Sequence, residues 1–172
     1  YMAKGLDTGD IIEQTIVPIA DTDTGETLTD KLALAGAELI ISTLKKLEDG
    51  TAQRRTQNDE ESCYASMLSK DMGNIDFSMP AENIERLVRG LQPWPCAFTK
   101  INGKSVKIYE AKVTDAPDGA EPGQITGVTK KSFAIVCGEG ALQIKRLQPE
   151  GKKPMDVAAF LAGNRLSDGE RI

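Results

Sequence analysis

Residues 98–113 read FTKINGKSVKIYEAKV, two strand-like runs on either side of the pair Asn102-Gly103. An Asn-Gly pair between such runs is the strongest short-range signal for a β-hairpin, because these residues tolerate the positive φ angles of a tight turn. Three more short runs rich in apolar residues follow, at 124–128, 132–137 and 141–147. Strand starts about eight to twelve residues apart predict a small antiparallel barrel or sandwich.

Two short helices are predicted beside these strands. The first begins near Pro80 and carries an apolar stripe with the spacing of one helix face, namely Ile84, Leu87, Val88 and Leu91. It ends before the triplet Pro93-Trp94-Pro95, whose tryptophan we expect to be buried, with stacking on a nucleic-acid base as the alternative. The second helix has Pro154 in its first turn and ends at Gly163, with three inward residues, Val157, Phe160 and Leu161.

The first 52 residues predict a strand followed by a long helix. Residues 11–19 are rich in Ile, Val and Thr, which is typical of a strand. Thr27, with Asp30 three residues later, resembles a helix start, and leucines then recur at helical spacing. Gly50 follows the last of them, at a position where helix C-termini favour glycine.

A polar stretch without periodicity, residues 53–72, indicates an exposed linker between two domains, residues 1–52 and 73–172. The net charge of −5 is unevenly distributed, because residues 1–72 carry −7 and residues 73–172 carry +2. A polyanionic partner is therefore expected to meet the second half of the chain.

The composition excludes several classes of protein. The chain of 172 residues contains no histidine, which excludes a Ser-His-Asp triad, a Cys-His pair and a histidine-ligated metal site built from this chain alone. Its three cysteines, Cys63, Cys96 and Cys137, are widely spaced and predict reduced thiols, with neither a disulfide framework nor a metal site. No apolar run reaches the roughly 18–20 residues of a membrane span, and no signal peptide is visible, so we expect a cytoplasmic protein.

The segment Gly5-Leu6-Asp7-Thr8-Gly9-Asp10 is a turn cluster with a carboxylate between two glycines. From physical chemistry alone, two interpretations of Asp7 stay open. Its side chain either bonds the nearby backbone of a turn or faces a ligand at the loop that follows a strand.

This loop resembles the folate-loop motif of the 10-formyltetrahydrofolate-dependent formyltransferases. Further segments resemble the methionyl-tRNA formyltransferase family in particular: Tyr64-Ala65, Leu68-Ser69-Lys70 and Ile75-Asp76-Phe77 in its linker, then residues 91–95, 147–155 and 160–163. Because their order and spacing cover nearly the whole chain, the chain is identified as a member of that family. The resemblance implies the C-terminal portion of such an enzyme, truncated at its N-terminal side.

The resemblance also implies a fold and an activity. Residues 1–52 would be the end of a Rossmann-like α/β formyltransferase domain, and residues 73–172 a mostly β, OB-like barrel with short helices. The family transfers a formyl group from 10-formyltetrahydrofolate to the amino group of initiator methionyl-tRNA. Asp7 corresponds to its catalytic aspartate, and Gly5, Leu6 and Asp7 line its folate pocket. The family's catalytic asparagine and histidine have no counterpart here, so we expect an incomplete folate site and no activity from this chain alone.

Contact with tRNA is expected from a set of basic residues, namely Lys70, Lys130, Lys131, Lys145, Arg146, Lys152 and Lys153. Such contacts position tRNA through its phosphates without reading bases. We expect a monomer that uses no metal and binds no membrane. Two alternatives stay open: another formyltetrahydrofolate-dependent enzyme, acting on sugar nucleotides or as a hydrolase-type domain, and a stand-alone tRNA-binding module.

Overall fold

The predicted hairpin is present in the computed structural model, which describes residues 1–172 and divides them into two compact units, Tyr1–Met67 and Leu68–Ile172. Strands β1 (Ala97–Ile101) and β2 (Lys104–Thr114) pair antiparallel on either side of Asn102 and Gly103. Both turn residues have positive φ, 51° and 73°. This left-handed geometry is the reason that Asn-Gly is favoured at the turn.

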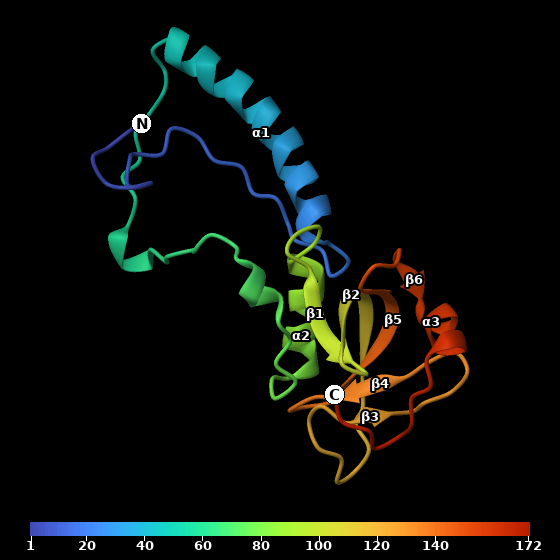
Figure 1. The fold of residues 1–172 in the computed structure, drawn as a ribbon. Coiled ribbons are helices and arrows are strands. Elements are labelled where there is room, and N and C mark those ends of the chain that lie inside the picture. The colour runs from blue at the N-terminus through green and yellow to red at the C-terminus, as the bar shows by residue number, and fades with distance from the viewer. The chain divides into compact units, whose positions relative to one another are not determined.

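Six strands form one antiparallel sheet in the second unit (Figure 1); the antiparallel pairing was predicted, whereas the sixth strand, β6, was not. The order is β1-β2-β5-β4-β3, and β6 pairs with the last part of β5. The four later strands are β3 (Ile125–Thr126), β4 (Ala134–Val136), β5 (Ala141–Pro149) and β6 (Met155–Asp156). Each run predicted as a strand in this second unit contains one, although β3 and β4 are shorter than the runs that hold them.

Two helices flank the sheet, and a 3-10 turn, η2 (Lys70–Gly73), precedes them. Helix α2 (Ala81–Gly90) begins after Pro80, as predicted. Helix α3 (Val157–Gly163) ends at Gly163, as predicted, but Pro154 lies before its first turn. The reason is that Met155 and Asp156 pair with β5 and delay the helix. None of the helices combines the length and the hydropathy needed to cross a bilayer.

The prediction that Trp94 is buried is wrong, since this side chain is 56% exposed. Its neighbours Leu91 and Cys96 are buried instead. All three cysteines are free, as predicted, with Cys96 and Cys137 buried and Cys63 exposed.

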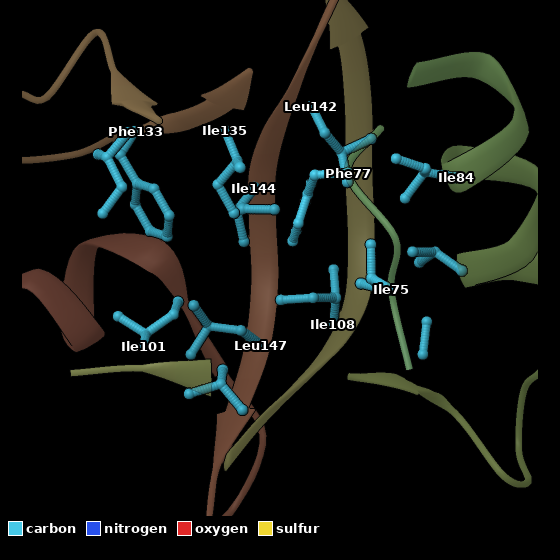
Figure 2. Packing of buried hydrophobic residues seen from close by; sticks show 14 of the residues in the cluster. Ile75, Phe77, Ile84, Ile101, Ile108, Phe133, Ile135, Leu142, Ile144 and Leu147 are labelled. Atoms are coloured by element: carbon cyan, nitrogen blue, oxygen red, sulfur yellow. The ribbon is translucent and has the colours of Figure 1, made fainter. Parts of the chain in front are cut away.

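The core of the second unit lies between one face of the sheet and its helices (Figure 2). The central strands contribute Ile108, Ile144 and Leu147, each 0% exposed. Phe133 packs beside Phe160 of α3, with ring centroids 6.4 Å apart. Burying each such side chain contributes about 1.5–3 kcal/mol, so this cluster dominates the stability of the unit.

A register shift around Glu110 changes which side chains of β2 face the core. Val106 and Ile108 are buried before the shift, whereas Ala111 and Val113 pack against the core after it. Such a bulge bends the strand and reverses the alternation of its faces. The outer face of the sheet therefore carries Lys107 and Tyr109 just before the shift.

The first unit is built around helix α1 (Gly25–Glu48). The predicted start at Thr27 is three residues late, because Thr27 is the second member of a capping box whose first member is Thr24. The amide of Thr27 donates to the hydroxyl of Thr24 at 3.2 Å, and the amide of Thr24 donates to the hydroxyl of Thr27 at 3.0 Å. The helix ends before Gly50, whose φ is 69°.

The predicted strand over residues 11–19 is not formed. Only Ile11 pairs with another backbone, in an isolated bridge to Arg55, and no second strand lies beside the residues that follow. Glu13 connects this segment to α1 instead, because its carboxylate accepts from Thr43 at 2.8 Å, Ser42 at 3.1 Å and Lys46 at 2.5 Å. A run rich in β-branched residues becomes a strand only where a partner backbone is available.

Candidate functional site

The loop at residues 5–10 holds Asp7 in an uncommon conformation. The φ angle of Asp7 is 54°, in the left-handed region that aspartate enters more readily than most residues. Gly9 is needed for a different reason, since a Cβ atom there would lie 1.7 Å from the carbonyl oxygen of Tyr1. The backbone nitrogen of Tyr1 in turn donates to the carbonyl of Asp10 at 2.9 Å. The loop is therefore closed by its own backbone contacts.

A segment far along the chain, residues 54–58, supports the same loop, and we call it the brace. Ile11 and Arg55 exchange two backbone hydrogen bonds, of 2.9 and 3.0 Å. The side-chain amide of Gln57 donates to the carbonyl oxygens of Asp7, at 2.8 Å, and Gly9, at 2.7 Å. Gln57 was not predicted from the sequence, because a glutamine in a polar, aperiodic stretch carries no local signal of a contact about fifty residues away.

Two side chains fix the brace itself. The guanidinium of Arg54 lies 3.7 Å from the centroid of the Tyr1 ring, within the range of a cation–π interaction. The guanidinium of Arg55 donates to the side-chain carbonyl of Gln14. The brace and the loop thus form one connected piece of the first unit.

The loop and the brace line a groove of about 880 Å³ within the first unit. Its walls include Leu6 and Asp7 from the loop, Arg55 and Gln57 from the brace, and Tyr64. The Asp7 carboxylate makes no hydrogen bond or ion pair within the chain, and Leu6 is 83% exposed. These two side chains, predicted to meet the folate, can therefore contact a molecule in the groove. Gly5, the third predicted residue, is exposed beside them.

The basic residues predicted to contact tRNA lie at four places in the second unit. Lys70 begins η2, Lys130 and Lys131 lie in the turn between β3 and β4, Lys145 and Arg146 lie on β5, and Lys152 and Lys153 lie in the turn between β5 and β6. Lys145 is half-buried and the other six are exposed. None of the seven forms an ion pair within the chain, so their charges are available to a polyanion.

Arg146 belongs to a mixed basic and aromatic surface on the outer face of β2 and β5. Lys107 lies opposite Gln148 in the register, and the hydroxyl of Tyr109 donates to the side-chain oxygen of Gln148 at 2.8 Å. Burial, together with the neighbouring Cys96, raises the pKa of Tyr109 in spite of the opposing charge of Arg146, so the hydroxyl stays protonated and donates at neutral pH. Lys107 and Tyr109 were not predicted from the sequence, because only the register shift reveals that they face outward together with Arg146.

Comparison with known proteins shows which protein family this chain resembles. Residues 67–165 match the model of the formyl transferase C-terminal domain. The chain is 46% identical to a methionyl-tRNA formyltransferase of Agathobacter rectalis over 98% of its own length and 54% of that protein. It is 43% identical to a methionyl-tRNA formyltransferase of Geobacter metallireducens over 99% of its length and 54% of that protein.

Solved structures of lower identity share the fold. HypX from Aquifex aeolicus in complex with tetrahydrofolic acid matches with a TM-score of 0.64 and 18% identity, over 92% of this chain and 28% of that one. The N-formyltransferase from Helicobacter canadensis, in complex with folinic acid and dTDP-3-aminofucose, matches with a TM-score of 0.63 and 24% identity, over 83% of this chain and 52% of that one. At these identities the likeness shows the fold alone.

The chain therefore belongs to the formyl transferase family and contains that family's C-terminal domain. Among curated proteins its similarity is to methionyl-tRNA formyltransferases, as the sequence predicted. The chain spans about half the length of the curated relatives it matches.

Proposed function

We propose that this chain forms the C-terminal half of an enzyme that transfers a formyl group from 10-formyltetrahydrofolate to the amino group of initiator methionyl-tRNA. The observation that carries the proposal is the 46% identity to a methionyl-tRNA formyltransferase along 98% of the chain. The folate ligands in two structures of similar fold support a folate donor. The three free cysteines are in keeping with a cytoplasmic enzyme, which we expect to be a monomer.

The proposal assigns a role to each part of the chain. Residues 1–52 would end a Rossmann-like catalytic domain, residues 53–72 would be the linker, and residues 73–172 would be an OB-like domain that contacts tRNA. The exposed apolar side chains of α1 support the first assignment, because a helix of an α/β domain buries one face against a sheet.

Asp7 is proposed to act at the reacting groups. During transfer the attacking amine loses a proton and negative charge grows on the formyl oxygen, so the site needs an acid–base group and a hydrogen-bond donor. The Asp7 carboxylate, which has no partner within the chain, can accept a hydrogen bond from the amine or orient a neighbouring acid–base group. The exposed Leu6 side chain can pack on the apolar part of the folate. Because the chain contains no histidine, we propose that it does not complete the site alone.

Contact with tRNA is proposed for the seven predicted basic residues, and for Lys107 and Tyr109 on the outer face of β2 and β5. Each phosphate contact steepens the fall of affinity with salt. Replacing Lys107 and Arg146 with alanine is expected to reduce the log–log salt slope of initiator tRNA binding by about one unit per lost contact. Arg86→Ala is a matched control, because Arg86 is engaged with Glu82 on α2. An unchanged slope in the double variant would remove this surface from the proposal.

The activity is tested in a chimera that places the N-terminal part of the Agathobacter rectalis relative, the part that this chain does not cover, before Tyr1. Formyl transfer is measured for the chimera, for the 172-residue chain and for the intact relative as the reference. We expect transfer to initiator methionyl-tRNA from the chimera and none from the chain alone. Asp7→Asn should lower the rate of the chimera at least about 100-fold, by analogy with losses of a single group at other catalytic centres.

The same assay separates the proposal from its alternatives. A chimera that formylates a dTDP-amino sugar in preference to methionyl-tRNA would indicate a sugar-nucleotide enzyme. Undiminished transfer by Asp7→Asn would remove the catalytic assignment. A folded chimera that binds initiator tRNA without transferring formyl groups would favour the stand-alone binding module.

A further inference from the structure

We propose that Gln57 is a positioning residue for Asp7: its side-chain amide fixes the loop that presents the Asp7 carboxylate to the groove. The proposal rests on the proposed role of Asp7 in formyl transfer. Gln57 contacts no reacting group in this assignment, because both of its hydrogen bonds go to backbone carbonyls.

The first observation is the geometry of the two hydrogen bonds. The nitrogen of the Gln57 side chain lies 2.8 Å from the carbonyl oxygen of Asp7 and 2.7 Å from that of Gly9. One carbonyl belongs to Asp7 and the other to Gly9, so the two hydrogen bonds hold the backbone on both sides of Thr8. One NH2 group with two hydrogens satisfies both acceptors, and among uncharged side chains only an amide offers such a pair from one atom.

The second observation is the conformation that this contact accompanies. Asp7 has a φ of 54°, in the left-handed region that costs a residue with a Cβ atom free energy, although it costs an aspartate less than most. No other side chain bonds the backbone of residues 5–9. The direction of the Asp7 Cα–Cβ bond, and hence the place of its carboxylate, depends on that φ value.

The third observation is that Gln57 is itself held in place. It follows Arg55 by two residues, and Arg55 is fixed by the two backbone bonds to Ile11 and by its side-chain bond to Gln14. Gln57 therefore transmits the position of the brace to the loop. The polar stretch after α1 thereby has a function beyond that of a connection.

The test uses the chimera described above and three substitutions. Gln57→Glu keeps the shape of the side chain but places a carboxylate against two carbonyl oxygens, while Gln57→Ala removes the bonds without repulsion. Gln53→Glu is the matched control, because Gln53 is exposed in the same stretch, makes no hydrogen bond and receives the same change of charge.

We expect Gln57→Glu to lower kcat about 10- to 100-fold and to leave KM for methionyl-tRNA within about twofold, since displacing a reacting group by about 1 Å costs on that order. Gln57→Ala should also lower kcat, but by a smaller factor. Gln53→Glu should match the unsubstituted chimera. A normal kcat in Gln57→Glu, or an equal loss in Gln53→Glu, would overturn the proposal.

A double-variant cycle distinguishes positioning from general destabilisation. If Gln57 acts through Asp7, adding Gln57→Glu to Asp7→Asn should change kcat less than about twofold further. A full additional loss would mean that Gln57 acts by another route. Full activity of Asp7→Asn alone would instead be a failure of the proposed function, so the two failures are distinguishable.

A readout on the 172-residue chain does not depend on activity. The carbonyl carbon resonances of Asp7 and Gly9 report their hydrogen bonds directly. Both should shift in Gln57→Glu and in Gln57→Ala and stay in place in Gln53→Glu. Unmoved resonances in both Gln57 variants would show that the two bonds do not form, and the proposal would fall.

Discussion

The two units of this chain are stabilised by different kinds of contact. The second unit buries apolar side chains from every strand but β6 and from both helices, and every buried hydrophobic residue of the chain belongs to it. The first unit buries only two residues, and both are polar: Asp23 and Thr43. The second unit therefore has the core of an independent domain, while the first depends on side-chain hydrogen bonds.

Helix α1 shows this difference between the two units in its exposed apolar side chains. Its apolar side chains are largely exposed, and they include Leu32, Leu34, Ile40, Ile41, Leu44 and Leu47. The leucines whose spacing predicted this helix are present, but no apolar layer covers them within the chain. A helix that exposes such a face is stabilised by its caps and by local contacts, since propensity alone holds an isolated helix only marginally.

The largest expected effect is on the free energy of unfolding, when one leucine in each unit is replaced by alanine. Leu142→Ala removes a side chain that is 0% exposed and should lower the free energy of unfolding by about 2–5 kcal/mol. Leu34→Ala removes one that is 73% exposed and should change it by less than about 0.5 kcal/mol. Urea unfolding followed by the fluorescence of Trp94, the single tryptophan, measures the second unit directly. A loss of comparable size in Leu34→Ala would show that α1 contributes to the same cooperative core.

The contrast also explains what the sequence could predict. The hairpin, α2 and the end of α3 were predictable, because their signals are local: Asn102-Gly103, an apolar stripe after Pro80, and Gly163. The strand predicted for residues 11–19 failed because strand formation depends on a partner backbone that no local pattern reveals. The start of α1 was placed late because both members of its capping box are threonines, and only the structure shows which one is the cap.

The candidate site likewise contains residues that the sequence pointed to and residues that it did not. The loop with Asp7 was found because two glycines around a carboxylate form a recognisable turn. Gln57, Lys107 and Tyr109 were not found, because their roles depend on contacts made across about fifty residues or on a register shift in the sheet. Side chains whose neighbours come from distant segments have no signature in a single sequence.

A smaller effect should appear on acidification, and chiefly in the first unit. The hydrogen bond from Lys46, with those from Thr43 and Ser42, holds the pKa of Glu13 below its usual 4.5. The hydrogen bond from Lys31, with those from Ala20 and Thr27, likewise holds the pKa of Asp23 below its usual 3.8. A carboxyl with a lowered pKa in the folded state stabilises it above the unfolded pKa and loses that contribution as pH falls through the folded value.

We therefore expect the contacts of Glu13 and Asp23 with α1 to weaken below about pH 4.5. Amide chemical shifts of α1 between pH 7 and pH 3 measure the change. Glu13→Gln should show shifted α1 resonances already at pH 7. Its further change on acidification should be smaller, because only the protonation of Asp23 remains to cause it. An acid response of α1 that is identical in Glu13→Gln would mean that the Glu13 contacts do not hold this segment.

The smallest expected effect is on chemical labelling of the three cysteines, which compares how the two units open. Cys63 in the first unit is exposed, whereas Cys96 and Cys137 in the second are buried, and burial raises the pKa of Cys137 to about 11. Because the thiolate is the reactive form, Cys137 should resist alkylation at pH 8 for two reasons, lack of access and lack of ionisation. We expect one thiol, Cys63, to react rapidly with iodoacetamide and the other two only as the second unit opens.

Leu142→Ala, which lowers the free energy of that opening, should accelerate labelling of Cys96 and Cys137 while the rate at Cys63 stays constant. Equal acceleration at all three thiols would show that the units open together, and it would end the distinction between a unit with its own core and one held by hydrogen bonds.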